Sequence, residues 1–358
     1  MGVLKRFDDF VSNLKETDRI CIFFDPDPDG ISAAVIANKA IERLRGRKAD
    51  MVMYQEHGDL EIKEENIAKL KSNGINKIFI MDLAVDQYPE KVREVSEFAE
   101  ICILDHHKVY NDLNSERIVH LKPQMFDSEE PSSYITAKMS YDLFMKHVDI
   151  SDMDWLAAVG ILGDAAWRRW KDFVGEVCKR YGIDFNKLLE SKIGNVMRLI
   201  ASAPEFGFGV IAECFDVVSN AKSFEDVERS SLVKYRDIIG NEMYRFMKEF
   251  KRNAETHDDV IFFFMRSKYS VGSTLSTRMS FKQPDKTVIV IQDAGEDFYR
   301  VSLRRQDFKV KVNDLVSEAT KDLENASGGG HVPAAGGRIM KRDLERFKSN
   351  ILRILGKA

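Results

Sequence analysis

The chain has 358 residues, of which 44% are hydrophobic and 31% are charged, ordinary values for a globular protein long enough to form two domains. These values exclude a disordered or fibrous chain. The net charge of −4 excludes a global electrostatic attraction to nucleic acid, so any such partner must be held by a local basic patch or through bound metal.

The expected cellular location of the protein follows from the lack of a recognisable signal peptide or membrane span in the sequence. The start MGVLKRFDDFVSNLKE has no long apolar core of a signal peptide, and no stretch approaches the length of a membrane span. The cysteines are scattered, without the paired spacing of a metal site, and we expect buried free thiols. They are Cys21, Cys102, Cys178 and Cys214. The sequence therefore predicts a soluble cytoplasmic protein with no membrane partner.

Apolar strand-like runs alternate with helical patterns in the first part of the chain. The expected strands are residues 19–25, 50–55, 77–82, 101–105 and 117–121. One expected helix between them begins at Ile31, and two others cover residues 64–72 and 89–98. Because this alternation is typical of βαβ units, we expect a parallel sheet covered by helices on both faces.

Further along the chain, helical patterns give way to a second α/β segment. Helices are expected at residues 132–148 and 152–167, and from Arg168 to about His257 the sequence is mostly helical. The second segment has expected strands at 260–265, 287–292 and 298–304, helices near 273–280 and 312–323, a glycine-rich loop and a final helix. The final helix carries a packing stripe on one face, made of Leu344, Phe347, Ile351 and Leu355.

The predicted fold is therefore α/β with three parts. A parallel-sheet N-terminal domain covers residues 1–167, and a helical insert or connector covers 168–258. A smaller α/β C-terminal domain covers 259–358, and the active site is expected in the cleft between the two α/β domains.

The stretch CIFFDPDPDG, residues 21–30, places carboxylates on alternate positions before a glycine. An EF-hand loop begins in the same way but needs a bidentate Glu at its twelfth position. Counted from Asp25, that position is Ile36, and an apolar strand-like run precedes the acids where an EF-hand has a helix. The stretch is typical of a strand, an acidic turn and a helix, and a solvated turn is the alternative to a site.

Acidic and histidine side chains follow three of the expected strands. Asp25, Asp27 and Asp29 follow the first strand, Asp82 the third, and Asp105, His106 and His107 the fourth. Asp164 closes the apolar helical pattern LAAVGILGD, where a lone carboxylate is costly unless it is paired or bound to a ligand. Parallel strands end at one edge of their sheet, so we expect these groups to meet there.

This donor set favours hard or borderline metal ions. Many carboxylates with one or two imidazoles suit Mn²⁺ or Mg²⁺ better than structural zinc, which prefers cysteine and histidine. The carboxylates exceed what one ion needs. Two ions bridged by a carboxylate would activate water for phosphoryl displacement, and Asp82, on the middle strand, is the candidate bridge.

Two further features are candidates for substrate binding. In the loop ASGGGHVPAAGGRI, Gly328, Gly329 and Gly330 would let backbone amides approach an anion, with His331 beside them. Arg304, on an expected strand, could bind a phosphate in bidentate fashion, and a solvated surface arginine is the alternative.

Aromatic and basic residues directly follow Asp164. Trp167 and Trp170 flank Arg168 and Arg169, and this group could stack bases and hold phosphates, as single-strand binders do. Tryptophan on a helix is more often part of the core.

The ordered motifs resemble those of the DHH phosphoesterases. The sequences DPDPDG, MD at 81–82, DHH at 105–107 and GD at 163–164 look like the four motifs of that family. GGGHVPAAGG looks like the signature of its associated C-terminal domain. Within the family, the sequence is similar to RecJ-like single-strand exonucleases and to the smaller nanoRNase members.

The resemblance implies the role of each site residue. Asp25, Asp27, Asp29, Asp82, His106 and Asp164 would be metal ligands, and which of Asp25 and Asp27 binds the first ion stays open. His107 would face the scissile phosphate, and Asp105 would orient a histidine. His331 and the loop from Gly328 would hold the substrate.

The resemblance also implies a function and partners. The leading hypothesis is a Mn²⁺-dependent exonuclease, with two Mn²⁺ or with Mg²⁺ in their place, that acts on single-stranded DNA or RNA or on short oligonucleotides. Alternatives with the same site are an oligoribonuclease that also cleaves 3′-phosphoadenosine 5′-phosphate, or a cyclic-dinucleotide phosphodiesterase. A scaffold of a replication complex is the alternative from another class. A replication or repair protein could dock on the helical insert.

Overall fold

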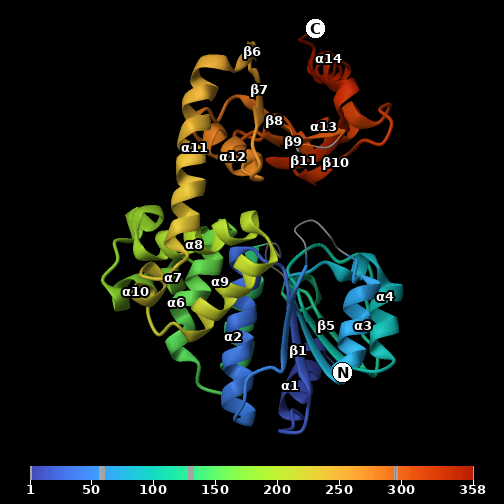
Figure 1. Ribbon diagram of the computed structural model, residues 1–358, viewed down its shortest axis with the longest axis vertical. Helices are drawn as coiled ribbons and strands as arrows, with labels where there is room; N and C mark the ends of the chain where they lie inside the picture. Colours follow the sequence, from blue (N-terminus) through green and yellow to red (C-terminus); the bar gives the residue numbers. More distant parts are fainter. Residues whose placement is uncertain (1, 56–60, 128–132, 294, 296, 358) are drawn as a thin grey trace. The chain divides into compact units, whose positions relative to one another are not determined.

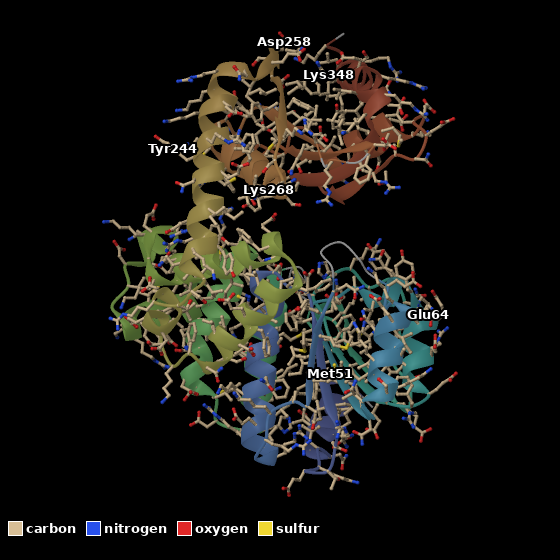
Figure 2. All side chains as sticks on the ribbon, in the orientation of Figure 1. Met51, Glu64, Tyr244, Asp258, Lys268 and Lys348 are labelled. Carbon is tan, nitrogen blue, oxygen red and sulfur yellow. The ribbon has the colours of Figure 1, made fainter. Side chains whose placement is uncertain are left out.

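The computed structural model describes residues 2–55, 61–127, 133–293, 295 and 297–357 (Figure 1). The chain divides into two compact units, residues 1–236 and 237–358. In each unit, side chains fill the space between the sheet and the helices that cover it (Figure 2). The predicted three-part division at residues 167 and 258 stays a prediction.

The first unit is built on a parallel sheet of five strands in the order β2-β1-β3-β4-β5. The strands are β1 Ile20–Phe24, β2 Met51–Tyr54, β3 Lys77–Met81, β4 Glu100–Leu104 and β5 Ile118–Leu121. All five coincide with the expected strands. β1 and β3 are buried along their whole length, as expected for central strands of a parallel sheet.

Helices cover both faces of this sheet. Alternate residues of each strand point to opposite faces, and they therefore belong to two different apolar clusters. Phe24 and Phe79 pack with α1, α2, α5 and α6, whereas Phe23 and Ile80 pack with α3 and α4. Figure 1 shows α2 on one side of the sheet and α3 and α4 on the other. These helices are α1 Val3–Ser12, α2 Pro28–Arg45, α3 Glu64–Ser72, α4 Pro89–Ser96, α5 Thr136–Phe144 and α6 Asp154–Gly163. The predicted α/β fold with a parallel sheet is confirmed.

The segment after α6 is helical, as predicted. Its helices are α7 Lys171–Tyr181, α8 Lys192–Ser202, α9 Phe208–Asn220, α10 Phe224–Glu228 and α11 Val233–Asn253. Side chains of α7 to α10 share the apolar cluster of the first unit with α2 and α6. The boundary between the two compact units falls inside α11. Residue 132, the start of one predicted helix, lies outside the described residues.

The second unit contains a six-stranded sheet in the order β10-β11-β9-β8-β7-β6. Only the β7–β8 pair is parallel. Its elements are β6 Glu255–His257, β7 Val260–Arg266, α12 Gly272–Lys282, β8 Thr287–Asp293, β9 Phe298–Arg304, α13 Val312–Thr320, β10 Ser327–His331, β11 Ala334–Met340 and α14 Leu344–Ile354. The predicted stripe of α14 packs against this sheet, with Phe347 and Ile351 fully buried.

The prediction of a glycine-rich loop at residues 326–339 is wrong, because this segment forms the hairpin β10–β11. A Cβ at Gly337 would lie 2.3 Å from the Ser327 carbonyl oxygen, and one at Gly328 would lie 2.7 Å from Val316 Cγ2. The glycines therefore permit close packing within the hairpin and against α13. Without side chains, the segment lacks the alternation by which a strand is recognised in a sequence.

No helix among the described residues is long and apolar enough to cross a membrane. All four cysteines are buried thiols.

Candidate metal centre

The acidic and histidine motifs come from three neighbouring strands of the parallel sheet. Asp25 follows β1, Asp82 follows β3 and Asp105 follows β4, and these strands are adjacent in the sheet. The carboxyl ends of parallel strands lie at one edge, so the motifs start at the same edge, as the sequence predicts.

The first motif forms the turn between β1 and α2. Asp27 is the N-cap of α2, and its Oδ1 accepts a hydrogen bond of 2.8 Å from the amide of Gly30. Pro28 occupies the first helical position, where its missing N–H costs nothing. A Cβ at residue 30 would lie 2.1 Å from the carbonyl oxygen of Asp25, so the turn requires glycine.

Asp29 joins this motif to helix α5. Its side chain is fully buried and accepts hydrogen bonds of 2.8 Å from the amides of Thr136 and Ala137, in the first turn of α5. Helix α6 approaches the same carboxylate, because a Cβ at Gly160 would lie 2.9 Å from Asp29 Oδ1. Asp29 is thus held by the positive end of one helix and covered by another.

Asp82 occupies a strained backbone position at the end of β3. Its φ of 62° lies in the left-handed region, which is uncommon for non-glycine residues. Thr136 Oγ1 donates a hydrogen bond of 2.8 Å to Asp82 Oδ1. His106 Nε2 lies 3.5 Å and His107 Nδ1 lies 4.0 Å from the same oxygen. This carboxylate therefore lies between the two histidines and α5.

His106 lies between two possible sets of metal ligands. Its Nε2 is 3.1 Å from Asp164 Oδ2, at the C-cap of α6. Potential ligand atoms of Asp82, His106 and His107 lie within 4.8 Å of one another, and so do those of Asp29, His106 and Asp164. The two sets share His106, so Asp29, Asp82, His106, His107 and Asp164 form one cluster.

The electrostatics of this cluster favour bound cations. Burial, followed by repulsion from neighbouring carboxylates, raises the pKa of Asp27, Asp29 and Asp82 well above the usual range. The acids that raise the pKa of Asp27 include Asp25, Asp164 and Asp29, so the whole first motif belongs to the cluster. Burial would lower the pKa of His106, but Asp164 and Asp82 raise it well above its usual value. Oxygen donors with imidazole fit Mn²⁺ or Mg²⁺, which would offset this repulsion.

Behind His107 lies a buried ionic network that the sequence analysis missed. Asp105 Oδ1 lies 2.7 Å from His107 Nδ1, and Asp105 Oδ2 lies 2.8 Å from Lys122 Nζ. Lys122 Nζ also lies 2.8 Å from Asp86 Oδ1, and Asp86 Oδ2 accepts a hydrogen bond of 2.7 Å from the amide of Tyr110. The Lys122, Asp86 and Asp105 side chains are fully buried.

The network fixes the charge and the position of His107. Burial would raise the pKa of Asp105, but His107 and then Lys122 hold it well below its usual range. Burial would lower the pKa of His107, but Asp105 raises it to about 9. The positions of two members were a signal in the sequence: Lys122 follows β5, and Asp86 lies four residues after Asp82. Neither residue belongs to one of the motifs, so neither was predicted.

Replacing Lys122 with methionine is expected to lower the free energy of unfolding by about 3–5 kcal/mol, because two carboxylates are then left buried without their cation. Urea denaturation at pH 7 measures this loss. Lys108→Met is the matched control, since Lys108 is exposed and should change stability by less than about 0.5 kcal/mol. A loss below about 1 kcal/mol for Lys122→Met would contradict the ionic role of this lysine.

The predicted substrate residues Arg304, Gly328, Gly329, Gly330 and His331 all lie in the second unit, the last four on β10. The Arg304 guanidinium donates hydrogen bonds to Thr277 Oγ1 at 3.0 Å and Ser273 Oγ at 2.8 Å. It also donates to the carbonyl oxygen of Ala335 at 3.0 Å. Burial lowers the pKa of Arg304 to about 10, and no carboxylate among the described residues counteracts this shift.

The two predicted stacking residues pack against the core of the first unit. Trp170 Nε1 donates a hydrogen bond of 2.7 Å to the carbonyl oxygen of Ser133, and its ring lies 4.9 Å from that of Tyr134. The Lys138 ammonium lies 4.3 Å from the ring of Trp170. Trp167 is also partly buried against the core. These contacts give both side chains a packing role, the alternative that the sequence analysis left open.

Comparisons with known proteins place both units in described domain families. The DHH family, N-terminal domain, matches residues 19–161, and the DHHA1 domain matches residues 257–357. None of the curated proteins compared with the chain matches it. The first match contains all the site residues of β1, β3 and β4, and Asp164 follows three residues after its end.

Several solved structures are similar to the chain. RecJ from Thermus thermophilus, in complex with Mn²⁺, has a TM-score of 0.77 and 16% identity over 99% of this chain and 55% of RecJ. An exonuclease RecJ bound to manganese has a TM-score of 0.73 and 16% identity over 100% of this chain and 95% of that one. A pGpG-specific phosphodiesterase, PggH from Vibrio cholerae, has a TM-score of 0.55 and 15% identity over 95% of this chain and 100% of PggH.

At these identities the likeness concerns the fold, and the chain spans about half the length of the Thermus RecJ. The two domain matches together extend over more than half of the chain, in the order DHH then DHHA1. The chain belongs to the DHH family, with an N-terminal DHH domain followed by a DHHA1 domain.

Proposed function

We propose that this protein is a metal-dependent phosphodiesterase that removes nucleotides from an end of single-stranded DNA or RNA. The observation that supports this proposal most is the cluster of Asp29, Asp82, His106, His107 and Asp164, with ligand atoms within 4.8 Å in two overlapping sets. Structures of RecJ, which share the fold, hold Mn²⁺ or Mg²⁺.

Asp25, Asp27, Asp29, Asp82, His106 and Asp164 would hold the ions, with Asp82 as the bridge. When bound, two such ions supply a hydroxide nucleophile near neutral pH and stabilise charge on the attacking and leaving oxygens. Thr136 Oγ1 positions Asp82 by its hydrogen bond of 2.8 Å. The division of labour between Asp25 and Asp27 is for metal-binding measurements on single variants to decide.

His107 would contact the scissile phosphate. Its Nδ1 lies 2.7 Å from Asp105 Oδ1, which leaves Nε2 as the nitrogen to meet a substrate oxygen. Lys122 holds Asp105 from the other side at 2.8 Å. The imidazole therefore needs little reorganisation to donate a proton or a hydrogen bond to the phosphate.

His107→Gln is expected to lower kcat by roughly a hundredfold to a thousandfold, because one positioned proton donor is lost. The number of Mn²⁺ ions bound per chain should not change, as equilibrium dialysis would show. His147→Gln is the control, since His147 pairs with Asp8 at 2.9 Å, outside this cluster, and should keep the wild-type kcat. Loss of bound Mn²⁺ from His107→Gln would make His107 a ligand instead.

Two observations bear on which class of substrate the protein hydrolyses. In the DHHA1 domain, the guanidinium of Arg304 has no carboxylate partner among the described residues and could take a phosphate. The similarity to the pGpG phosphodiesterase supports a second candidate, the hydrolysis of dinucleotides. Both activities need the same metal centre and differ in substrate length.

A substrate panel separates these activities. We expect kcat/KM with Mn²⁺ to be highest for an end-labelled single-stranded DNA or RNA, compared with pGpG, a cyclic dinucleotide and 3′-phosphoadenosine 5′-phosphate. The end from which the label is lost first gives the polarity. Hydrolysis of pGpG alone would replace the exonuclease by the dinucleotide phosphodiesterase.

A further inference from the structure

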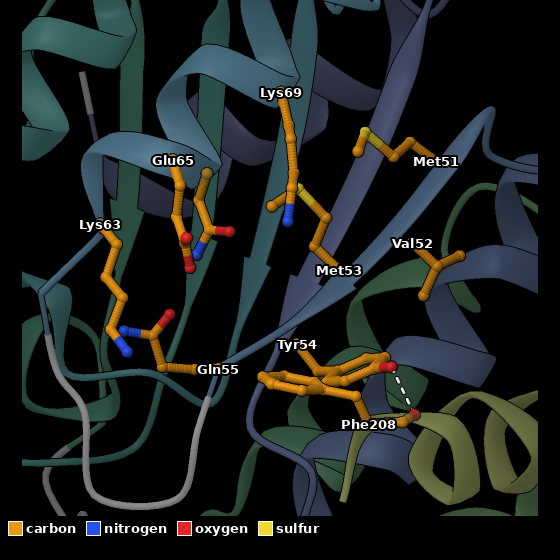
Figure 3. A pocket seen from close by; sticks show the side chains of 10 residues that line it. Met51, Val52, Met53, Tyr54, Gln55, Lys63, Glu65, Lys69 and Phe208 are labelled. Carbon is orange, nitrogen blue, oxygen red and sulfur yellow. Dashed lines mark hydrogen bonds between the residues drawn. The ribbon is translucent and has the colours of Figure 1, made fainter.

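A groove runs along the outer edge of the DHH-domain sheet, beside strand β2 (Figure 3). β2 is the edge strand, with no strand on its outer side among the described residues. The groove has a volume of about 320 Å³, within the range of small-molecule sites. All of its walls belong to the first unit.

The groove begins beside the first acidic motif. Tyr54 is in register with Phe24, the residue before Asp25, and the amide of Gln55 donates a hydrogen bond of 3.1 Å to the Phe24 carbonyl oxygen. Neighbouring strands are about 4.8 Å apart, so the backbone of Gln55 lies one strand spacing from the metal motif. A ligand in this groove would thus lie on the outer side of the strand that neighbours the first acidic motif.

One wall of the groove is a pair of aromatic rings, of which Phe208 is exposed and Tyr54 is partly buried. Phe208, at the start of α9, is 51% exposed, and its ring lies 5.2 Å from that of Tyr54, inclined by 31°. The Tyr54 hydroxyl donates a hydrogen bond of 2.5 Å to the Phe208 carbonyl oxygen, and Gly207 before it has a φ of 81°. The ring is therefore held at the surface by its backbone. Such a platform suits a nucleobase.

The opposite wall carries charged side chains of α3. Figure 3 shows Lys69 extending from α3 toward Met53 and the two aromatic rings. Lys63 and Glu65 also line the groove. The Lys69 ammonium is a point charge that suits one phosphate group.

A buried acceptor at the end of the groove adds a third, independent observation. Gln55 lines the groove, is 3% exposed, and uses its Nε2 to donate 2.6 Å to the Glu61 carbonyl oxygen. Its Oε1 is buried and has no hydrogen-bond partner among the described residues. A buried acceptor requires a donor, and the exocyclic amine of a base supplies one.

We propose that this groove binds one nucleotide of the single-stranded substrate. Its base would stack on the exposed ring of Phe208, which packs against Tyr54. An exocyclic amine would donate to Gln55 Oε1, and the phosphate would meet Lys69. This inference rests on the proposed function and adds a base preference to it. Bases with an amine in place of a carbonyl, such as cytosine against uracil, would bind more tightly.

Fluorescence anisotropy of labelled (dC)6 and (dU)6 hexanucleotides tests the groove. The full chain is used with Mn²⁺ and with Asp82→Asn in every sample to stop hydrolysis. Phe208→Ala should weaken binding of (dC)6 about five- to a hundredfold, the loss of one stacked base. Phe208→Tyr keeps the ring and should bind like the parent, and Leu189→Ala, also 51% exposed, is the matched control.

Two further comparisons address the amine and the phosphate. The parent should bind (dC)6 about fivefold more tightly than (dU)6, the effect of one hydrogen bond. Lys69→Gln should lower the slope of log Kd against log salt by about 0.7, whereas Lys71→Gln, which removes a partner of Glu94 at 3.5 Å, should not.

Equal binding by Phe208→Ala and the parent would overturn the proposal, and the groove would then be a free strand edge open to an extended peptide. Near-UV circular dichroism confirms that each variant is folded. Hydrolysis by the chain with native Asp82 is measured separately. Its absence would contradict the proposed function, while the anisotropy comparison would still decide whether the groove binds a nucleotide.

Discussion

Asp82→Asn is expected to lower the rate of phosphodiester hydrolysis by at least roughly a thousandfold. A bridging carboxylate supports both metal ions, and the loss of about 4 kcal/mol of transition-state stabilisation corresponds to that factor. Without metal, the same variant should be more stable than the wild type at pH 8, because one of several mutually repelling buried carboxylates is removed. We expect a melting temperature roughly 2–4 °C higher, the shift for about 1 kcal/mol in a domain of this size.

Asparagine is the appropriate replacement because it keeps the shape of the site. Asp82 has a φ of 62°, which asparagine tolerates better than alanine does, and an amide oxygen can still accept the hydrogen bond from Thr136. Initial rates with Mn²⁺ and melting curves in chelator measure the two effects. A near wild-type rate, or a clear loss of metal-free stability, would show that Asp82 is not a metal bridge.

Removal of metal ions by a chelator is expected to abolish activity and to make stability fall as the pH rises. Asp27, Asp29 and Asp82 have raised pKa values in the folded chain, so the unfolded chain releases these protons at lower pH. Their contribution to stability is therefore lost as the pH rises above about 4 toward the raised pKa values. The raised pKa of His106 acts in the same direction, since its stabilising proton is lost as the pH rises.

Mn²⁺ should reverse this trend by replacing the protons. At a hundred times its Kd, the ion adds about 2.7 kcal/mol to the free energy of unfolding, and the gain should be larger at pH 8 than at pH 5. Thermal unfolding at both pH values, with and without Mn²⁺, measures the effect apart from activity. Asp82→Asn is the control and should gain less. An equal gain in both proteins would contradict binding of Mn²⁺ at this cluster.

The sheet of the DHH domain could be predicted from sequence because each buried strand is a short apolar run between helical patterns. The same reasoning failed at the hairpin β10–β11, where Gly328 and Gly337 are needed for close packing and leave no alternating pattern. The helix predicted at residues 152–167 was also too long. Helix α6 ends at Gly163, and Ala165 adopts a φ of 55° that interrupts the helix.

The convergence of the acidic motifs at one sheet edge could be predicted from strand order, but their support could not. Thr136 donates hydrogen bonds to Asp82 and Asp29, which both lie more than fifty residues before it in the sequence. No local sequence pattern marks Thr136 for this role. Lys122 and Asp86 form a buried pair whose members resemble surface residues in the sequence. Such partners depend on tertiary packing, which a single sequence does not specify.

The proposed metal-dependent exonuclease activity is tested most directly by the hydrolysis of an end-labelled single-stranded oligonucleotide by the wild-type chain and by Asp82→Asn, each with and without Mn²⁺. We predict stepwise shortening from one end by the wild type with Mn²⁺, and no shortening in the other three reactions. Absence of cleavage by wild-type protein that retains bound Mn²⁺, or equal cleavage by Asp82→Asn, would contradict a metal-dependent exonuclease that uses Asp82.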